Sequence, residues 1–280
     1  MPCWRRARKR FWRKLRWPDV HHRPVIITRP LAQAQQLAAR VALLGRQVEI
    51  LPLLEILPLP ELSALQAVLA RLPEYALVAF VSPNAIDACF ASLPPQLLPW
   101  PPQVAIAVMG EGSRQALAAH GVDAHNARIF SPLDPERTDS STLLAALDLA
   151  ALQQGRVLIL RGESGRELLA DVLRGAGIVV EQVAAYRRQA PKFDAAIQTR
   201  LLDLLAMKAD WLITSSEALR ILMTGLQEMK QGDAVARMQQ QHLIVPHARI
   251  AETAQLFGFH HISLTGSGDE ALLAALQSTL

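Results

Sequence analysis

The sequence of 280 residues predicts an α/β protein built from two similar parallel-sheet lobes. Three observations lead to this prediction. Short aliphatic runs alternate with segments of helical periodicity, which is typical of parallel sheets covered by helices. One strand–helix–strand unit occurs twice at a long spacing, and each copy leads into an extended segment, so that the two segments suggest a two-stranded linker.

The clearest strand–helix–strand unit lies between residues 155 and 191. Its first strand, Val157 to Leu160, has four consecutive aliphatic residues and suits a sheet covered on both faces. A polar turn over residues 161–165 follows, and apolar residues at helical spacing then predict a helix that ends near Gly175. A second strand is expected over residues 179–185.

The same unit occurs between residues 23 and 58. Equivalent positions stand 132 residues apart, as in the pairs Arg29 and Arg161, and Gly45 and Gly177. Two later strand–helix units also repeat, beginning at Tyr75 and Val104 in one part and at Asp210 and His242 in the other. A repeat this long indicates two similar domains rather than a solenoid.

The other elements follow from periodicity and from turn residues. We expect strands over 24–28, 48–51, 75–81, 104–110, 127–130, 211–214, 242–246 and 260–266. We expect helices over 32–44, 61–73, 82–93, 111–121, 142–152, 195–205, 215–227, 248–258 and from 269 onward, with Ser82 as an N-cap and Pro83 in the first turn. Pro52, Pro58 and Pro60 make residues 52–60 an extended crossing segment rather than a central strand.

Composition fits a folded protein with packed cores, since 51% of the residues are hydrophobic and 19% are charged. No apolar run approaches the roughly 18 residues that indicate a membrane span. The two cysteines, Cys3 and Cys89, lack the spacing of a metal site or a disulfide framework. A reducing cytoplasm is therefore the expected location.

The basic charge is concentrated in residues 1–23, which hold nine Lys or Arg and one acid and leave 20 basic and 24 acidic residues elsewhere. This segment has no apolar core of a secretory signal and no serine of a transit peptide. We expect a disordered extension, or else an early start codon before a true beginning near Val20 or Val25. Its interleaved aromatic and arginine residues could also bind an anionic membrane or nucleic acid weakly.

The sequence has no Gly-x-Gly-x-x-Gly fingerprint, P-loop, His-Glu-x-x-His motif or nucleophile elbow. Instead, small polar residues recur where a strand passes into a helix, and free N–H groups there favour anions. The candidate ligand-binding residues of this kind are Thr28, Ser82, Asn84, Gly110, Ser113, Ser141, Thr214, Ser215 and Ser216. For any single one of them, ordinary helix capping is the commoner explanation, because Ser and Thr lead at caps regardless of function.

Arginines beside the strand ends could bind carboxylates through both nitrogens of the guanidinium group. The candidates are Arg29, Arg161 with the neighbouring Gly162, and Arg166, with solvated charge or an interdomain salt bridge as the alternative. His247 follows a strand and begins a helix, either as a site residue or as a cap. No pair of histidines or carboxylates has convincing ligand spacing, so no metal is expected.

An ordered series of short motifs covers about residues 24–280. The motifs are Ile27-Thr-Arg-Pro30, Ser82-Pro-Asn-Ala-Ile86, Ala107-Val-Met-Gly110, Val157-Leu-Ile-Leu-Arg-Gly162 with Gly165-Arg166, Ala185-Tyr-Arg-Arg188, Ile213-Thr-Ser-Ser216 and Pro246-His-Ala-Arg-Ile-Ala251. Each is weak alone, but together they resemble the bacterial type of uroporphyrinogen-III synthase. Ser113 stands where many relatives have threonine, and the basic tail has no counterpart.

The resemblance implies two flavodoxin-like lobes joined by a two-stranded linker, the first lobe being discontinuous. Lobe 1 would contain residues 24–51 and 187–280, and lobe 2 would contain residues 61–180. Residues 52–60 and 181–186 would be the linker strands. A monomer is expected.

The implied activity, in haem biosynthesis, is the closure of linear hydroxymethylbilane to uroporphyrinogen III with inversion of ring D. The substrate would be a linear tetrapyrrole polycarboxylate, and no cofactor would be needed. Tyr186 matches the family's recurrent tyrosine and would be the general acid, since a phenol carries its proton at neutral pH. A tyrosine packed between the lobes is the alternative for this residue. For the whole chain, the alternatives are a non-catalytic two-lobed anion-binding or sensor protein and a sugar-nucleotide transferase.

Overall fold

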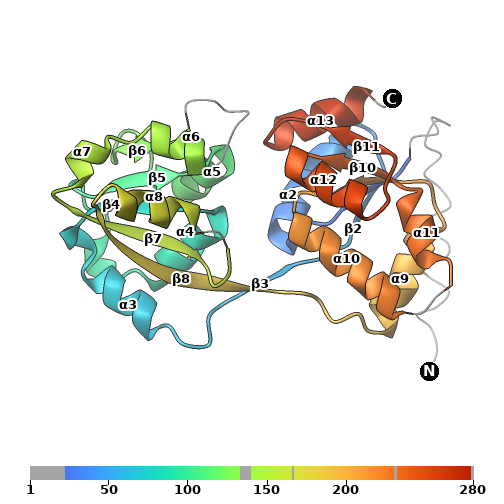
Figure 1. Ribbon diagram of the computed structural model, residues 1–280, viewed down its shortest axis with the longest axis horizontal. Coiled ribbons are helices and arrows are strands. Elements are labelled where there is room, and N and C mark those ends of the chain that lie inside the picture. Colours follow the sequence, from blue (N-terminus) through green and yellow to red (C-terminus); the bar gives the residue numbers. More distant parts are fainter. Residues whose placement is uncertain (1–22, 133–139, 166, 230–231, 279–280) are drawn as a thin grey trace.

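The computed structural model describes residues 23–132, 140–165, 167–229 and 232–278, and these residues form two α/β lobes (Figure 1). The lobe drawn at the right in Figure 1 combines blue and orange-red segments and therefore contains both ends of the described chain. The other lobe contains the middle of the chain. The predicted α/β class with parallel sheets is confirmed.

The first lobe has a five-stranded parallel sheet in the order β11-β10-β9-β1-β2. Its strands are β1 (Val25–Ile27), β2 (Val48–Ile50), β9 (Asp210–Leu212), β10 (His242–Val245) and β11 (Ile262–Leu264). Helices α9 (Ala195–Leu205), α10 (Ser216–Glu228), α11 (Ala234–Gln239) and α12 (Ala248–Leu256) cover one face of the sheet. Helices α2 (Leu31–Leu43) and α13 (Asp269–Ser278) cover the other. The side chains of β1 alternate accordingly, since Ile26 packs on the first face and Val25 and Ile27 on the second.

The second lobe has a six-stranded sheet in the order β3-β8-β7-β4-β5-β6. Its strands are β3 (Glu55–Leu57), β4 (Tyr75–Phe80), β5 (Ala105–Val108), β6 (Ile129–Phe130), β7 (Arg156–Gly162) and β8 (Val179–Gln189). Helices α3 (Ser63–Ala70), α4 (Pro83–Ser92) and α5 (Glu111–Ala119) cover one face. Helices α6 (Ser140–Ala145), α7 (Leu149–Leu152) and α8 (Leu168–Gly175) cover the other. Short 3-10 turns lie at 72–74 and 95–97.

The two sheets have the same topology, as the sequence repeat predicts. When the strands of lobe 1 are numbered in the sequence β1, β2, β9, β10, β11 and those of lobe 2 in the sequence β7, β8, β4, β5, β6, both sheets have the order 2-1-3-4-5. The register agrees as well. Val25 pairs with Val48 in lobe 1, and Val157 pairs with Val180 in lobe 2, each position being shifted by 132 residues. The chain enters this common topology at different strands in the two lobes, so one lobe is a circular permutation of the other.

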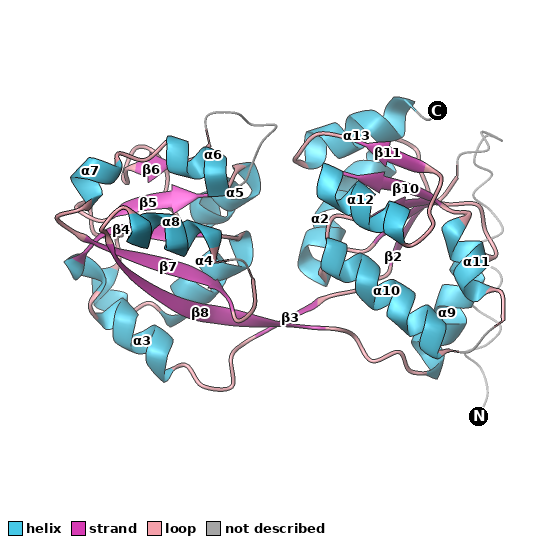
Figure 2. Cartoon of the chain, viewed as in Figure 1, coloured by secondary structure: helices cyan, strands magenta, loops and turns pink. Residues whose placement is uncertain are grey.

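Two extended segments cross between the lobes, and Figure 2 shows β3 and the end of β8 side by side at this point. β3 pairs antiparallel with Arg187–Gln189. Residues 181–186, the expected second linker strand, pair with β7 within the sheet of lobe 2. The eleven residues of β8 form one uninterrupted strand, so no turn residue marks where the sheet ends and the crossing begins.

Two elements differ from the sequence predictions. The helix expected over 142–152 is divided into α6 and α7, because the side chain of Asp148 accepts a hydrogen bond from the backbone N–H of Ala151 and begins a new helix. Helix α11 is not among the predicted elements. It is only six residues long, and Ala234 and Met238 are its buried contacts, so its apolar periodicity is short.

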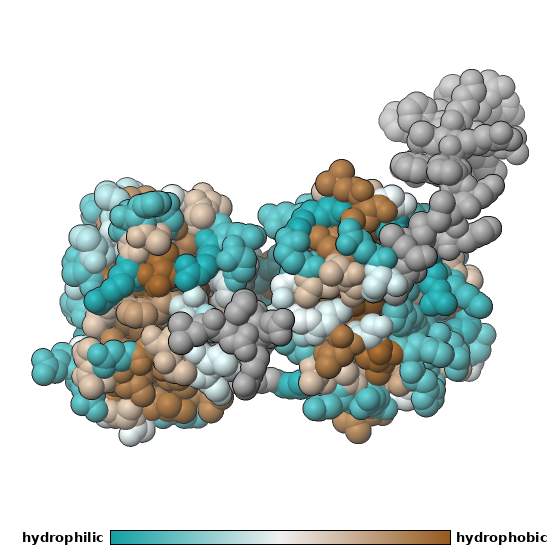
Figure 3. Space-filling model, turned by 90° about the horizontal axis from the view of Figure 1, so that it is seen from above, coloured by the Kyte–Doolittle hydropathy of each residue, from teal (hydrophilic) through white to brown (hydrophobic). Residues whose placement is uncertain are grey.

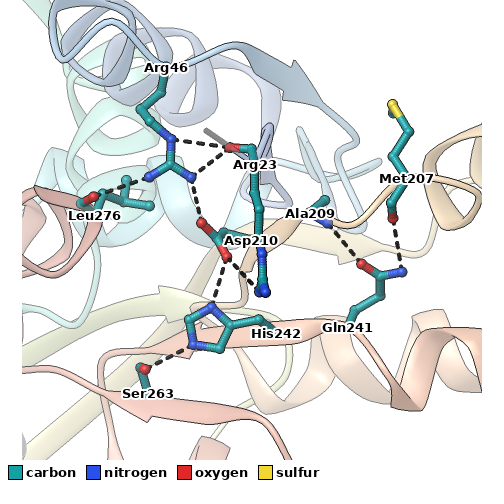
Figure 4. A network of polar contacts seen from close by, with 9 residues as sticks. All are labelled: Arg23, Arg46, Met207, Ala209, Asp210, Gln241, His242, Ser263 and Leu276. Carbon is teal, nitrogen blue, oxygen red and sulfur yellow. Dashed lines mark hydrogen bonds and ion pairs between the residues drawn. The ribbon is translucent and has the colours of Figure 1, made fainter. Parts of the chain in front are cut away.

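A buried ion pair lies at the start of the strands of lobe 1 (Figure 4). Asp210 at the first position of β9 accepts hydrogen bonds from Arg46 Nη2 at 2.5 Å and from His242 Nδ1 at 2.8 Å. Arg46 also donates to the backbone oxygens of Arg23 and Leu276, and so joins segments from both ends of the chain. Asp210 is 2% exposed and Arg46 is 4% exposed. Burial opposes ionisation of Asp210, but the hydrogen bonds from His242 and Arg46 outweigh it and hold its pKa below the ordinary value.

Replacing Asp210 with asparagine should lower the free energy of unfolding by about 3–5 kcal/mol near neutral pH, because Arg46 would remain buried without an opposite charge. The depressed pKa means that the carboxylate stabilises the fold above the ordinary aspartate pKa and loses this effect as the pH falls through the folded-state value. The difference between wild type and Asp210→Asn should therefore be constant near neutral pH and shrink only below about pH 4. Urea unfolding across pH measures it.

The matched control for this prediction is Asp171→Asn. Asp171 forms an exposed pair with Arg174 at 3.9 Å on α8, and such pairs contribute less than about 1 kcal/mol. Equal effects of the two substitutions would contradict the role given to Asp210.

Candidate functional site

Polar residues from both lobes meet where the strands end and the next helices begin. The side chain of Gln33, in the first turn of α2, donates to the Oδ1 atom of Asn84 in the first turn of α4, at 3.2 Å. Arg188 at the end of β8 pairs with Glu217 in the first turn of α10 at 2.9 Å. Seen from above in Figure 3, a groove runs between the two lobes. Ligands of open α/β sheets bind beyond the carboxyl ends of the strands, so this groove is the candidate site.

Tyr186 lies on the lobe 2 side of this site. Its phenolic oxygen is 3.0 Å from the hydroxyl oxygen of Ser82, and either atom can be the donor. The residue is 6% exposed. A register shift in β7 places it opposite Gly162, and the backbone oxygen of Tyr186 accepts a hydrogen bond from Glu163. The structure therefore brings together three of the predicted site residues.

Ser82 is the N-cap of α4, as predicted, with Pro83 at the first helical position. Its hydroxyl oxygen accepts a hydrogen bond from the backbone N–H of Ala85 at 3.3 Å. A hydroxyl group has two lone pairs and one hydrogen, so Ser82 can cap the helix and still exchange a hydrogen bond with Tyr186. Capping and site chemistry are therefore compatible at this residue.

Gly162 makes room for the tyrosine ring. A Cβ atom at Gly162 would lie 3.1 to 3.3 Å from the Cζ, hydroxyl and Cε2 atoms of Tyr186, which is closer than ordinary van der Waals contact. Glycine at this position therefore leaves the space that the phenol occupies.

Arg161 makes its polar contacts with residues that closely follow it in the chain. The guanidinium donates to the Gly162 carbonyl at 3.2 Å and to Glu167 at 2.5 Å, and only 7% of the side chain is exposed. It packs so closely beneath Gly165 that a Cβ atom there would lie 2.6 Å from Nη2. Hydrogen bonds from Gln182 and Arg161 hold the pKa of Glu167 below its usual range. Arg161 therefore shapes the turn next to the tyrosine.

The lobe 1 candidates surround the opposite side of the groove. Thr28 is buried and donates to the Leu212 carbonyl at 2.8 Å, and it therefore joins the ends of two strands. Arg29 pairs with Asp269 at 2.6 Å in the first turn of α13. Ser215 caps α10 by accepting hydrogen bonds from two backbone N–H groups. Ser216 is buried and accepts from Thr253.

The remaining candidates are less directly placed. Gly110 is at the N-cap position of α5, and the buried Ser113 lies in its first turn. Ser141 is exposed in α6, and Thr214 is half-buried after β9. His247 begins α12 without a capping hydrogen bond from its side chain, and its Nδ1 lies 3.5 Å from the hydroxyl of Ser267. Arg166 lies outside the described residues.

Sequence reasoning did not include Gln33, Glu217 or Ser164 among the candidates; Ser164, in the turn after β7, accepts hydrogen bonds from Arg188. Gln33 and Glu217 lie in first turns of helices, as the predicted residues do, but their side chains have no motif that marks them. They become relevant only through residues of the other lobe. Among the described residues, no three His, Cys, Asp or Glu side chains cluster as metal ligands, and none of the described helices is long and apolar enough to cross a membrane.

The fold and the site together define a class of protein. Two α/β lobes of one topology, crossed by two extended segments, face each other with helix N-termini and hydroxyl groups, as is typical of a two-lobed protein that binds an anionic ligand between its lobes.

Comparisons with known proteins identify the family. The family described as Uroporphyrinogen-III synthase HemD matches residues 35–268. A curated uroporphyrinogen-III synthase from Salmonella typhimurium is 32% identical over 90% of this chain and 99% of its own length, and the one from Escherichia coli is 30% identical over the same shares. The chain belongs to the uroporphyrinogen-III synthase family.

Solved structures agree in fold. The uroporphyrinogen-III synthetase of Helicobacter pylori has a TM-score of 0.56 at 17% identity and covers 92% of this chain and 100% of that one. A mutant synthase from Thermus thermophilus has a TM-score of 0.55 at 16% identity and covers 91% and 97%. The two-lobed architecture expected from the motifs is therefore that of the family.

Replacing Gly162 with alanine should push the ring of Tyr186 by a few tenths of an ångström and weaken its contact with Ser82, because the new Cβ atom would meet the ring at 3.1 Å. We expect turnover to fall at least tenfold with little loss of folded protein. Steady-state kinetics and circular dichroism measure these two effects. Gly175→Ala is the control, since a Cβ atom at that position meets nothing within 4 Å. Equal activities of the two variants would contradict the role of Gly162.

Proposed function

We propose that this chain closes linear hydroxymethylbilane to uroporphyrinogen III with inversion of ring D, in haem biosynthesis and without a cofactor. The observation that carries the proposal is the contact between Tyr186 and Ser82 at 3.0 Å, at the position where the family's tyrosine is expected. Membership of the synthase family over most of the chain supports the reaction itself.

Binding is assigned to the helix N-termini around the groove. The substrate carries eight carboxylates, and the free N–H groups and dipoles of α4 and α10 favour negative charge. Ser82 and Ser215 cap these two helices from opposite lobes. A flexible chain held from both sides loses much of its freedom before it reacts, which is the main requirement for a reaction whose outcome depends on substrate conformation.

Tyr186 is assigned the role of general acid. In this step the phenol donates a proton to the terminal hydroxyl, and the bond between that hydroxyl and its carbon breaks. Water departs, and an azafulvenium cation remains. The substituted carbon of ring D then attacks this cation to form a spiro intermediate. The bond from that carbon to its original methylene bridge breaks, the released bridge bonds to the free α-carbon of ring D, and loss of the proton from that carbon restores the pyrrole. The hydrogen bond from Ser82 can stabilise the phenolate that remains after proton transfer.

We also propose that the protein acts as a monomer in the cytoplasm, on a small-molecule tetrapyrrole. The small number of cysteines, without the spacing of a disulfide framework, supports a reducing compartment. The basic tail of residues 1–23, of which only Arg23 lies within the described residues, is assigned at most a weak contact with anionic lipid or nucleic acid.

Replacing Tyr186 with phenylalanine should reduce turnover by about 10²–10⁴-fold, because it removes only the proton donor and keeps the packing of the ring. Spontaneous closure to the uninverted isomer should then compete. Incubation with freshly prepared hydroxymethylbilane, followed by chromatographic separation of the isomers, measures both the rate and the ratio.

The chain contains one other tyrosine, which provides a matched control. Tyr75 lies at the opposite end of the lobe 2 sheet, and its hydroxyl donates to Glu181 at 2.5 Å. Tyr75→Phe should leave the isomer ratio unchanged. A folded Tyr186→Phe variant that makes the inverted isomer at the wild-type rate would remove Tyr186 from the mechanism and leave substrate folding as the enzyme's contribution.

A further inference from the structure

Arg188 lies two residues beyond Tyr186 on β8, so both side chains point to the same face of the strand. Its Nη2 atom donates to the backbone oxygen of Ser164 at 3.0 Å and to the Ser164 hydroxyl at 3.2 Å. Ser164 belongs to the turn that follows Gly162. One side of the guanidinium is therefore fixed to lobe 2, next to the proposed general acid.

The other side of the guanidinium faces lobe 1. Nη1 lies 2.9 Å from Oε2 of Glu217, which is in the first turn of α10 immediately after Ser216. The two side chains are 25% and 38% exposed, so solvent reaches the pair. The ion pair thus joins the two lobes across the groove at a place that a soluble anion can reach.

Other arginines of the region differ in this respect. Arg161 pairs with Glu167 within lobe 2, and Arg29 pairs with Asp269 within lobe 1. Their side chains are more buried, at 7% and 15% exposure, and opening the lobes would leave both pairs intact. Arg188 is held by Ser164 in one lobe and pairs with Glu217 in the other, so this ion pair would break if the lobes moved apart.

A ligand carboxylate can replace Glu217 at little cost. A solvent-accessible ion pair contributes at most about fivefold to an equilibrium constant, and a ligand carboxylate can take the position at Nη1 that Glu217 occupies. Ser164 keeps the guanidinium in place during the exchange, so little side-chain freedom is lost when the ligand binds.

We propose that Arg188 binds a carboxylate of the polycarboxylate ligand, and that Glu217 is its partner only while the groove is empty. The inference rests on the proposed function for the identity of the ligand. Without ligand, Glu217 neutralises Arg188, and the ion pair connects the two lobes. Binding of the ligand displaces Glu217 and so releases α10 from β8. The exchange thereby couples occupancy of the groove to movement of the lobes.

The test is whether each of two substitutions raises or lowers the affinity for the ligand. The probe is uroporphyrin III, the stable oxidised octacarboxylate, titrated into the full chain by calorimetry. Arg188→Gln should weaken binding about tenfold, because it removes the guanidinium. Glu217→Gln should strengthen binding by up to about fivefold, because it removes the competing carboxylate. Arg188→Lys keeps the charge but not the guanidinium that Ser164 holds in place, and its affinity should fall between those of wild type and Arg188→Gln.

Matched controls lie on the same helix. Arg220→Gln and Glu228→Gln change the net charge equally at exposed positions of α10 and should shift affinity less than twofold. If Glu217→Gln weakens binding as Arg188→Gln does, the ion pair is a structural tie only and the proposal is wrong. Affinities within twofold of wild type for both variants would also overturn it.

Small-angle scattering without ligand tests the tie between the lobes separately. Both Arg188→Gln and Glu217→Gln should increase the radius of gyration, and unchanged values in both would contradict the coupling. These measurements do not depend on turnover. A chain that makes no uroporphyrinogen III, yet shows opposite signs in the binding experiment, would overturn the proposed function and leave the exchange at Arg188 standing.

Discussion

The buried ion pair between Arg46 and Asp210 is the interaction on which the architecture depends. It joins the turn after α2, from the beginning of the chain, to the first residue of β9, about 160 residues later by sequence numbering. Because the two ends of the chain complete one lobe, the other lobe must be inserted between them. An inserted lobe needs two connections, and these are the paired segments of β3 and β8.

The inserted lobe has the same topology as the first but different polar chemistry. Ser82 and Ser215 cap equivalent helices in the two lobes. Tyr186 lies over Ser82, whereas the residue 132 positions earlier is the buried Leu54. Under the proposed mechanism, one wall of the groove carries the general acid and the other mainly caps helices and binds the ligand. A symmetric fold can direct an asymmetric reaction because only one copy carries the phenol.

Three arginines around the groove have carboxylate partners before any ligand binds. Arg29, Arg161 and Arg188 each have a carboxylate partner, and Arg161 is also held by a backbone carbonyl. Paired arginines avoid the cost of an uncompensated charge in a partly desolvated groove. The pairs differ in exposure, and the proposed exchange uses the partly exposed pair that joins the lobes.

The sequence by itself determined the alternation of strands and helices, the repeat at 132 residues and the cap at Ser82 with Pro83, because these depend on local periodicity and backbone geometry. The approach of the tyrosine to Ser82 and the folding of Arg161 beneath Gly165 depend on the register of β7 and β8 and on the turn between β7 and α8, which no single segment specifies. The same applies to the end of the lobe 2 sheet within β8, where the strand shows no break. The pair between Arg188 and Glu217 joins different lobes, so only the tertiary structure decided it.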